Sequence, residues 1–87
     1  MAIFGSLFGS SRKIFHTKDE IKKSLFRLNT LTQDQREIIF NIVAGELDDN
    51  GVTEFEWKKR LSPIFYQLVK EGKISQIDYE KLKNLGN

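Results

Sequence analysis

Residues 32–47, TQDQREIIFNIVAGEL, constrain the fold of this chain more than any other stretch. At 100° per residue, the large apolar side chains in its second half cover roughly 200° of a helical wheel. An ordinary surface helix shows a narrower apolar stripe, so we expect a central helix that packs on more than one side. These side chains are Ile38, Ile39, Phe40, Ile42, Val43 and Leu47.

Helix start signals occur four times along the chain. Each is a Thr or Ser followed three residues later by an acid or amide, the pattern of a capping box. They predict helices at about 18–28, at 32–47, from Thr53 to just before Gly72, and at about 76–85. Pro63 lies inside the third helix, and because proline removes a backbone donor and crowds the preceding turn, we expect a kink or break near residues 61–62.

The predicted fold class is therefore all-α, a compact bundle of four short helices, or five if Pro63 splits the third. A chain of 87 residues forms one domain at most, and we expect a single helical domain at 14–87. The apolar stripes of the helices predict the core. Its expected members are Ile21, Leu25, Leu28, Ile38, Ile39, Ile42, Val43, Leu47, Leu61, Ile64, Phe65, Leu68, Ile74 and Leu82.

Residues 1–13 are predicted to be a flexible apolar tail. They contain a tandem repeat, Ile-Phe-Gly-Ser then Leu-Phe-Gly-Ser, followed by Arg12 and Lys13. The apolar residues share one face if the segment is helical, although each glycine weakens that helix by roughly 1 kcal/mol. An apolar segment with basic residues behind it resembles an interfacial membrane anchor, but so small an anchor needs a second signal. The other interpretations are that the tail fills a groove on the bundle or is disordered.

Contact with a protein partner or a membrane is therefore predicted first for the apolar residues of the tail. Aromatic side chains off the main helical stripes are the second choice, because they must either pack or be offered to a partner. The first group is Ile3, Phe4, Leu7 and Phe8, and the second is Phe40, Tyr66 and Tyr79.

Few residues offer metal or catalytic chemistry. The absence of cysteine excludes thiolate metal sites and a cysteine nucleophile, and His16 is the only histidine. With Gly51 at the sixth position of a calcium loop, Glu46, Asp48 and Asn50 fall at ligand positions, but Trp57 falls at the twelfth and cannot ligate. We therefore expect no enzyme, no cofactor and no metal.

Basic residues crowd the C-terminal third, whereas residues 31–56 carry one basic and seven acidic groups. A helix-turn-helix around Gly72 would suit nucleic-acid binding, but the start of its second helix carries Asp78 and Glu80, which repel phosphate. Nucleic-acid binding is thus the alternative function. Its candidate contacts are Lys58, Lys59, Arg60, Lys70, Lys73, Lys81 and Lys83.

Residues 64–85 carry a leucine-containing helix, then Gly-x-Ile-Ser, an acid and aromatic pair, and lysines around a leucine. In this pattern they resemble the short helical hairpin of the SHOCT family, although Ile77 stands where that family usually has an acid. The resemblance implies an interaction or oligomerisation element. The matching residues are Leu68, Gly72, Ile74, Ser75, Asp78, Tyr79, Lys81, Leu82 and Lys83.

The predicted function is a small non-enzymatic adaptor that contacts a protein or membrane surface. Its expected partners are an unknown protein, a membrane bound peripherally, or a second copy of the chain. No stretch approaches 18 apolar residues, and the absence of cysteine fits a reducing compartment. We therefore expect a cytoplasmic protein, or one peripheral to the membrane.

Overall fold

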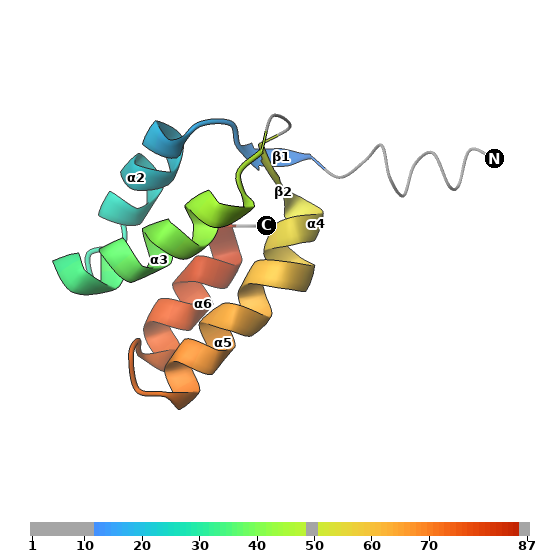
Figure 1. The fold of residues 1–87 in the computed structure, drawn as a ribbon. Helices are drawn as coiled ribbons and strands as arrows, with labels where there is room; N and C mark the ends of the chain where they lie inside the picture. The colour runs from blue at the N-terminus through green and yellow to red at the C-terminus, as the bar shows by residue number, and fades with distance from the viewer. Residues whose placement is uncertain (1–11, 49–50, 86–87) are drawn as a thin grey trace.

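A computed structural model describes residues 12–48 and 51–85 (Figure 1). In this part of the chain, four helical segments surround one core, and a two-stranded sheet lies where the N-terminal segment enters. The fold is thus mostly α-helical. In chain order the elements are β1 (Lys13–Phe15), α2 (Lys18–Phe26), α3 (Gln33–Glu46), β2 (Val52–Thr53), α4 (Glu54–Glu56), η1 (Trp57–Leu61), α5 (Ser62–Lys70) and α6 (Gln76–Leu85).

All four predicted helix starts carry their caps. In each, a Thr or Ser side chain accepts a hydrogen bond from the backbone N–H three residues later, which satisfies one of the free donors of the first turn. Three of them are reciprocal, because the acid or amide also accepts from the backbone N–H of the cap residue. The reciprocal pairs are Thr32–Gln35, Thr53–Glu56 and Ser75–Asp78, whereas Glu20 of α2 accepts from the N–H of His16.

Helix α3 makes polar contacts to α2 and to the turn before α6, but its buried apolar face is narrower than predicted. The guanidinium of Arg36 donates to two carbonyls at the end of α2, and Gln35 donates to the carbonyl of Lys73 before α6. Ile39 and Val43, one turn apart, are fully buried. Ile38, at the edge of the predicted arc, is 37% exposed.

The small sheet was not predicted. β1 and β2 run antiparallel, with Lys13 opposite Thr53 and Phe15 opposite Val52. Strands of three and two residues are too short to show a period-two pattern, so the sequence carries no strand signal here. Lys13, which the sequence analysis assigns to the tail, lies in this sheet.

Gly51 allows the two strands to come together. Its φ is +80°, in the left-handed region that favours glycine. A Cβ at this position would lie 2.4 Å from the carbonyl oxygen of Phe15, which is shorter than any real contact. The sheet therefore depends on a residue without a side chain.

The helix from residue 54 to residue 70 is continuous, so the break expected at Pro63 does not occur. Instead, η1 is a π-helical turn, in which the N–H of Ser62 donates to the carbonyl of Trp57, five residues earlier. Proline lacks the N–H of a normal helical bond and crowds the carbonyl four residues before it. The wider turn ahead of Pro63 accommodates both effects without a break in the helix.

Trp57 lies at the centre of the core and is fully buried. Its ring packs against Phe15 from β1 and Phe65 from α5, with centroid distances of 5.6 Å and 5.3 Å. The indole N–H donates to the carbonyl of Leu82, at 2.8 Å, in the last turn of α6. Carbonyls in a last turn lack helical partners, so this bond satisfies both groups.

The predicted core is largely confirmed. Nine of its fourteen members are buried, Leu28, Ile42 and Leu47 are half-buried, and Ile38 and Ile64 are exposed. The two exposed residues lie beside the buried stripes of α3 and α5, where an apolar side chain is only partly covered. The prediction missed Phe15, Leu31, Val52 and Trp57, all of which are buried.

Asp78 is the one buried charged or polar residue in the described core. One carboxylate oxygen accepts from the N–H of Ser75, and the other accepts from the hydroxyl of Thr30. This carboxylate joins the start of α6 to the link between α2 and α3. Asp78 therefore has a structural role inside the fold and is not a surface group.

Candidate functional site

The first-choice contact residues of the tail lie outside the described residues. They are Ile3, Phe4, Leu7 and Phe8. The structure does describe the surface of the domain next to the point where this segment joins it.

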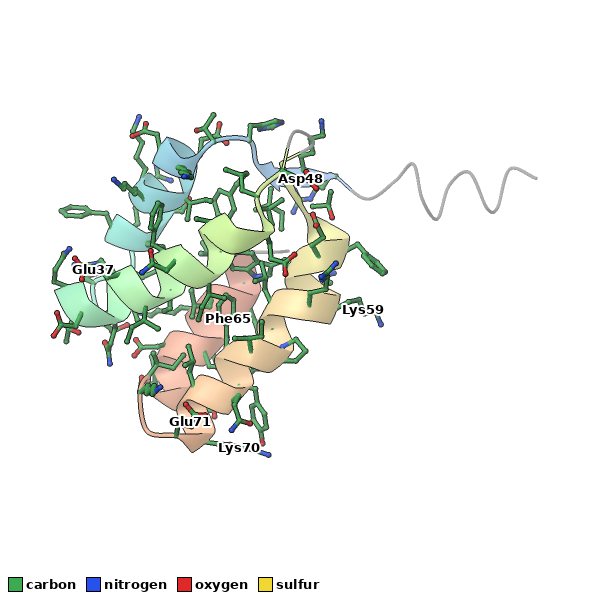
Figure 2. The ribbon with its side chains drawn as sticks, in the orientation of Figure 1. Glu37, Asp48, Lys59, Phe65, Lys70 and Glu71 are labelled. Atoms are coloured by element: carbon green, nitrogen blue, oxygen red, sulfur yellow. The ribbon has the colours of Figure 1, made fainter. Side chains whose placement is uncertain are left out.

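That junction surface consists of Arg12, Glu54, Phe55, Lys58 and Lys59. Arg12 is the first described residue and directly precedes β1. Its carbonyl accepts a hydrogen bond from the N–H of Glu54 at 2.8 Å. Phe55 is 58% exposed, and Lys59, one turn later, points outward from the helix (Figure 2). An exposed aromatic ring and three cations therefore lie where the apolar segment enters the fold.

Glu54 holds two of these cations side by side. Its carboxylate lies 3.0 Å from Nε of Arg12 and 3.7 Å from Nζ of Lys58. The hydrogen bond from Arg12 is the main cause that lowers the pKa of Glu54 below its usual value, with Lys58 adding to it. The junction surface contains one carboxylate against three cations, which leaves it net positive.

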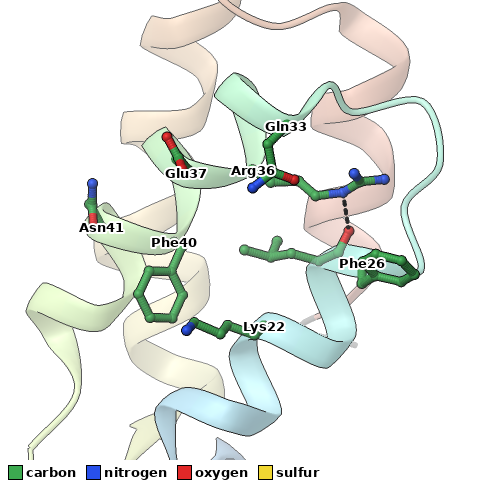
Figure 3. A pocket seen from close by; sticks show the side chains of 8 residues that line it. Lys22, Phe26, Gln33, Arg36, Glu37, Phe40 and Asn41 are labelled. Atoms are coloured by element: carbon green, nitrogen blue, oxygen red, sulfur yellow. Dashed lines mark hydrogen bonds between the residues drawn. The ribbon is translucent and has the colours of Figure 1, made fainter.

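A groove of about 510 Å³ lies between α2 and α3 (Figure 3). Phe40, a second-choice contact residue, lines it and is half-buried, with the ammonium of Lys22 5.3 Å from its ring centre. The guanidinium of Arg36 lies 5.2 Å from the ring of Phe26, which is 73% exposed. With Glu37 also in its wall, this lining suits a ligand that has both apolar and charged groups.

The other two second-choice residues lie together on the hairpin of α5 and α6. Tyr66 and Tyr79 are in ring contact, with centroids 5.6 Å apart and planes tilted by 56°. Lys70 lies 5.0 Å from the ring centre of Tyr66, and Lys83 lies 5.3 Å from that of Tyr79. We call these four residues the Tyr–Lys patch.

The remaining basic residues proposed as nucleic-acid contacts do not join this patch. Lys58 pairs with Glu54, Arg60 with Glu46 at 3.5 Å, and Lys73 with Glu71 at 3.3 Å. Lys59 belongs to the junction surface, and Lys81 is half-buried on α6. The seven predicted cations therefore divide between several surfaces and do not form one basic face.

No metal-binding arrangement is found among residues 12–48 and 51–85, where no three His, Asp or Glu side chains converge. Of the three residues that fall at calcium-loop positions in the sequence, Asn50 lies outside these ranges. Of the other two, Glu46 faces Arg60, and Asp48 forms a bridge to Gly51.

In comparisons with known proteins, no family model, curated protein or solved structure matches this chain. Within the described ranges, the helices are all too short or too polar to cross a bilayer.

Sequence reasoning missed Phe26 and Phe55, the two exposed phenylalanines of the described helices. Phe26 lies at the edge of the apolar stripe of α2, so the helical spacing does not decide whether its side chain is buried or exposed. For Phe55, the signal is present in the sequence: Trp57 and Leu61 define the buried side of this helix, and Phe55 with Lys59 falls on the other side.

Proposed function

We propose that this protein is a small non-enzymatic adaptor that attaches peripherally to an anionic membrane surface. The apolar N-terminal segment enters the interface, the junction surface lies against the lipid headgroups, and the helical domain is presented to a protein partner. The observation that supports the proposal is the exposed Phe55 on the helical turn that also carries Lys58 and Lys59 and pairs with Arg12, where the N-terminal segment joins the described domain.

The two parts supply the two signals that stable peripheral attachment requires. A short apolar segment alone gives weak, reversible binding, and a basic surface makes it stable. Each cation near an anionic leaflet contributes about 1 kcal/mol. Arg12 and Lys58 stay together because Glu54 lies between them, so this charge is arranged before binding.

Vesicle co-sedimentation tests the proposal with variants of each part. Phe4→Ser/Phe8→Ser should lower the vesicle-bound fraction for neutral and anionic lipid alike, because it removes buried apolar area. Lys58→Gln/Lys59→Gln should weaken binding about thirtyfold on anionic vesicles at low salt, from about 2 kcal/mol of lost attraction, and should leave binding to neutral vesicles unchanged.

Matched controls lie on α2. Lys22→Gln/Lys23→Gln makes the same change of charge on exposed residues of another helix, and Phe26→Ser removes an exposed ring as Phe55→Ser does. The tail and junction variants should lose binding, and the α2 variants should not. If the α2 variants lose as much, or if the full chain does not sediment with anionic vesicles, the proposal is wrong.

A further inference from the structure

The Tyr–Lys patch combines aromatic rings with cations that have no acidic partner. Tyr66 is 45% exposed and Tyr79 is half-buried. Within the described residues, neither Lys70 nor Lys83 forms an ion pair, and neither tyrosine hydroxyl makes a hydrogen bond. Both lysines are exposed residues, and each ammonium lies over the ring of its own tyrosine.

The arrangement of the patch is linear. Each lysine follows its tyrosine by four residues, one turn later on the same helix. α5 and α6 run in opposite directions (Figure 1), so the backbone positions of Lys70 and Lys83 lie on opposite sides of the tyrosine pair along the hairpin. Along the hairpin the order is Lys70, Tyr66, Tyr79, Lys83, and the backbone of each lysine lies about 6 Å along its helix from that of its tyrosine.

The acidic side chains of this hairpin are engaged elsewhere. Glu71 accepts from Gln67 and pairs with Lys73, and Glu80 accepts from Gln76. Asp78 is buried and bonded to the chain around it. Only Glu71 has a cationic partner, Lys73, because a hydrogen bond from a neutral amide does not cancel the charge of Glu80, so the lysines of the patch must hold phosphate against that charge.

We propose that the Tyr–Lys patch binds single-stranded nucleic acid. In the structure each lysine ammonium lies over its own tyrosine ring, so binding would move it to a backbone phosphate and free the ring for a base to stack on, since every base presents a π-face. An acidic peptide could use the lysines but would leave the ring faces without a matching partner. This activity is separate from membrane attachment, since the patch lies on α5 and α6 and shares no residue with the junction surface.

Fluorescence anisotropy with a short labelled oligothymidine tests the proposal on the full chain. Binding is expected at about 50 mM salt and should weaken steeply as salt rises. Tyr66→Leu/Tyr79→Leu should lower the affinity at least about tenfold, whereas Tyr66→Phe/Tyr79→Phe, which keeps both rings, should stay within about twofold of the parent. Lys70→Gln/Lys83→Gln should reduce the slope of log affinity against log salt by about 1.4.

The control for charge is again Lys22→Gln/Lys23→Gln, which should keep the full slope. Amide chemical-shift changes in the unaltered protein should concentrate on the outer side of α5 and α6, a readout that needs no variant. The proposal is overturned if no oligonucleotide binds at low salt, if the leucine pair binds as the parent does, or if the shifts map to α2 and α3. It is also overturned if the leucine pair loses binding to anionic vesicles but keeps its affinity for the oligonucleotide.

Discussion

Substituting Gly51 by alanine should disrupt the pairing of β1 with β2. The residue has a φ of +80°, and its new Cβ would lie 2.4 Å from the carbonyl oxygen of Phe15. The left-handed backbone alone costs an alanine about 1–2 kcal/mol. The contact is with backbone and not with the end of a flexible side chain, so β1 must move, and we expect a total loss of about 3 kcal/mol. For a domain of this size, that lowers the Tm by about 15 °C.

Two other glycines provide controls for this magnitude. Gly72 has nearly the same φ, +76°, but nothing lies within 4 Å of its built Cβ, so Gly72→Ala should cost only about 1 kcal/mol. Gly45 lies inside α3 in open space, and Gly45→Ala should stabilise the protein by about 0.5–1 kcal/mol.

Urea denaturation followed by circular dichroism measures all three glycine variants on one scale. The expected order of stability is Gly45→Ala, the parent, Gly72→Ala and then Gly51→Ala. If Gly51→Ala is no less stable than Gly72→Ala, the strand pairing does not bring Phe15 against this residue as described.

Three further predictions concern buried and charged groups. Trp57→Phe should reduce the free energy of unfolding in urea by about 2 kcal/mol, because it removes packed volume and leaves the carbonyl of Leu82 without its donor; a change below about 0.5 kcal/mol would contradict the central place of the indole. Asp78→Asn should cost about 1–2 kcal/mol by the same assay, because an amide cannot accept both hydrogen bonds that the carboxylate accepts. The lowered pKa of Glu54 stabilises the fold above the unfolded value of 4.5, and this contribution is lost as pH falls through the folded value. Arg12→Gln should move the NMR titration midpoint of the Glu54 carboxyl upward, and an unchanged midpoint would disprove the assigned cause.

Helix positions could be predicted from the sequence because caps and periodicity are local. Thr32 with Gln35 marks the start of α3 by a bond across three residues, and this signal needs no tertiary context. The sheet could not be predicted, because it joins residues 13–15 to residues 52–53 and neither strand is long enough to show a pattern. The π turn could not be predicted either, because it depends on how Trp57 and Pro63 are placed in the packed domain.

The candidate surfaces show the same limit. Tyr66 and Tyr79 stand out in the sequence as aromatic residues off the main stripes, and Lys70 and Lys83 as members of a basic third of the chain. That the four form one array depends on the antiparallel pairing of α5 and α6, which local patterns do not specify.

The most direct test of membrane attachment uses the absence of cysteine from the sequence. Lys13→Cys, beside the junction surface, and Lys22→Cys, on α2, each introduce one labelling site and remove one positive charge. Each protein is labelled with an environment-sensitive fluorophore and mixed with anionic vesicles. The proposal predicts a blue shift of the emission for the label at position 13 and none for the label at position 22. No shift at position 13, or an equal shift at both, would contradict attachment through the junction surface.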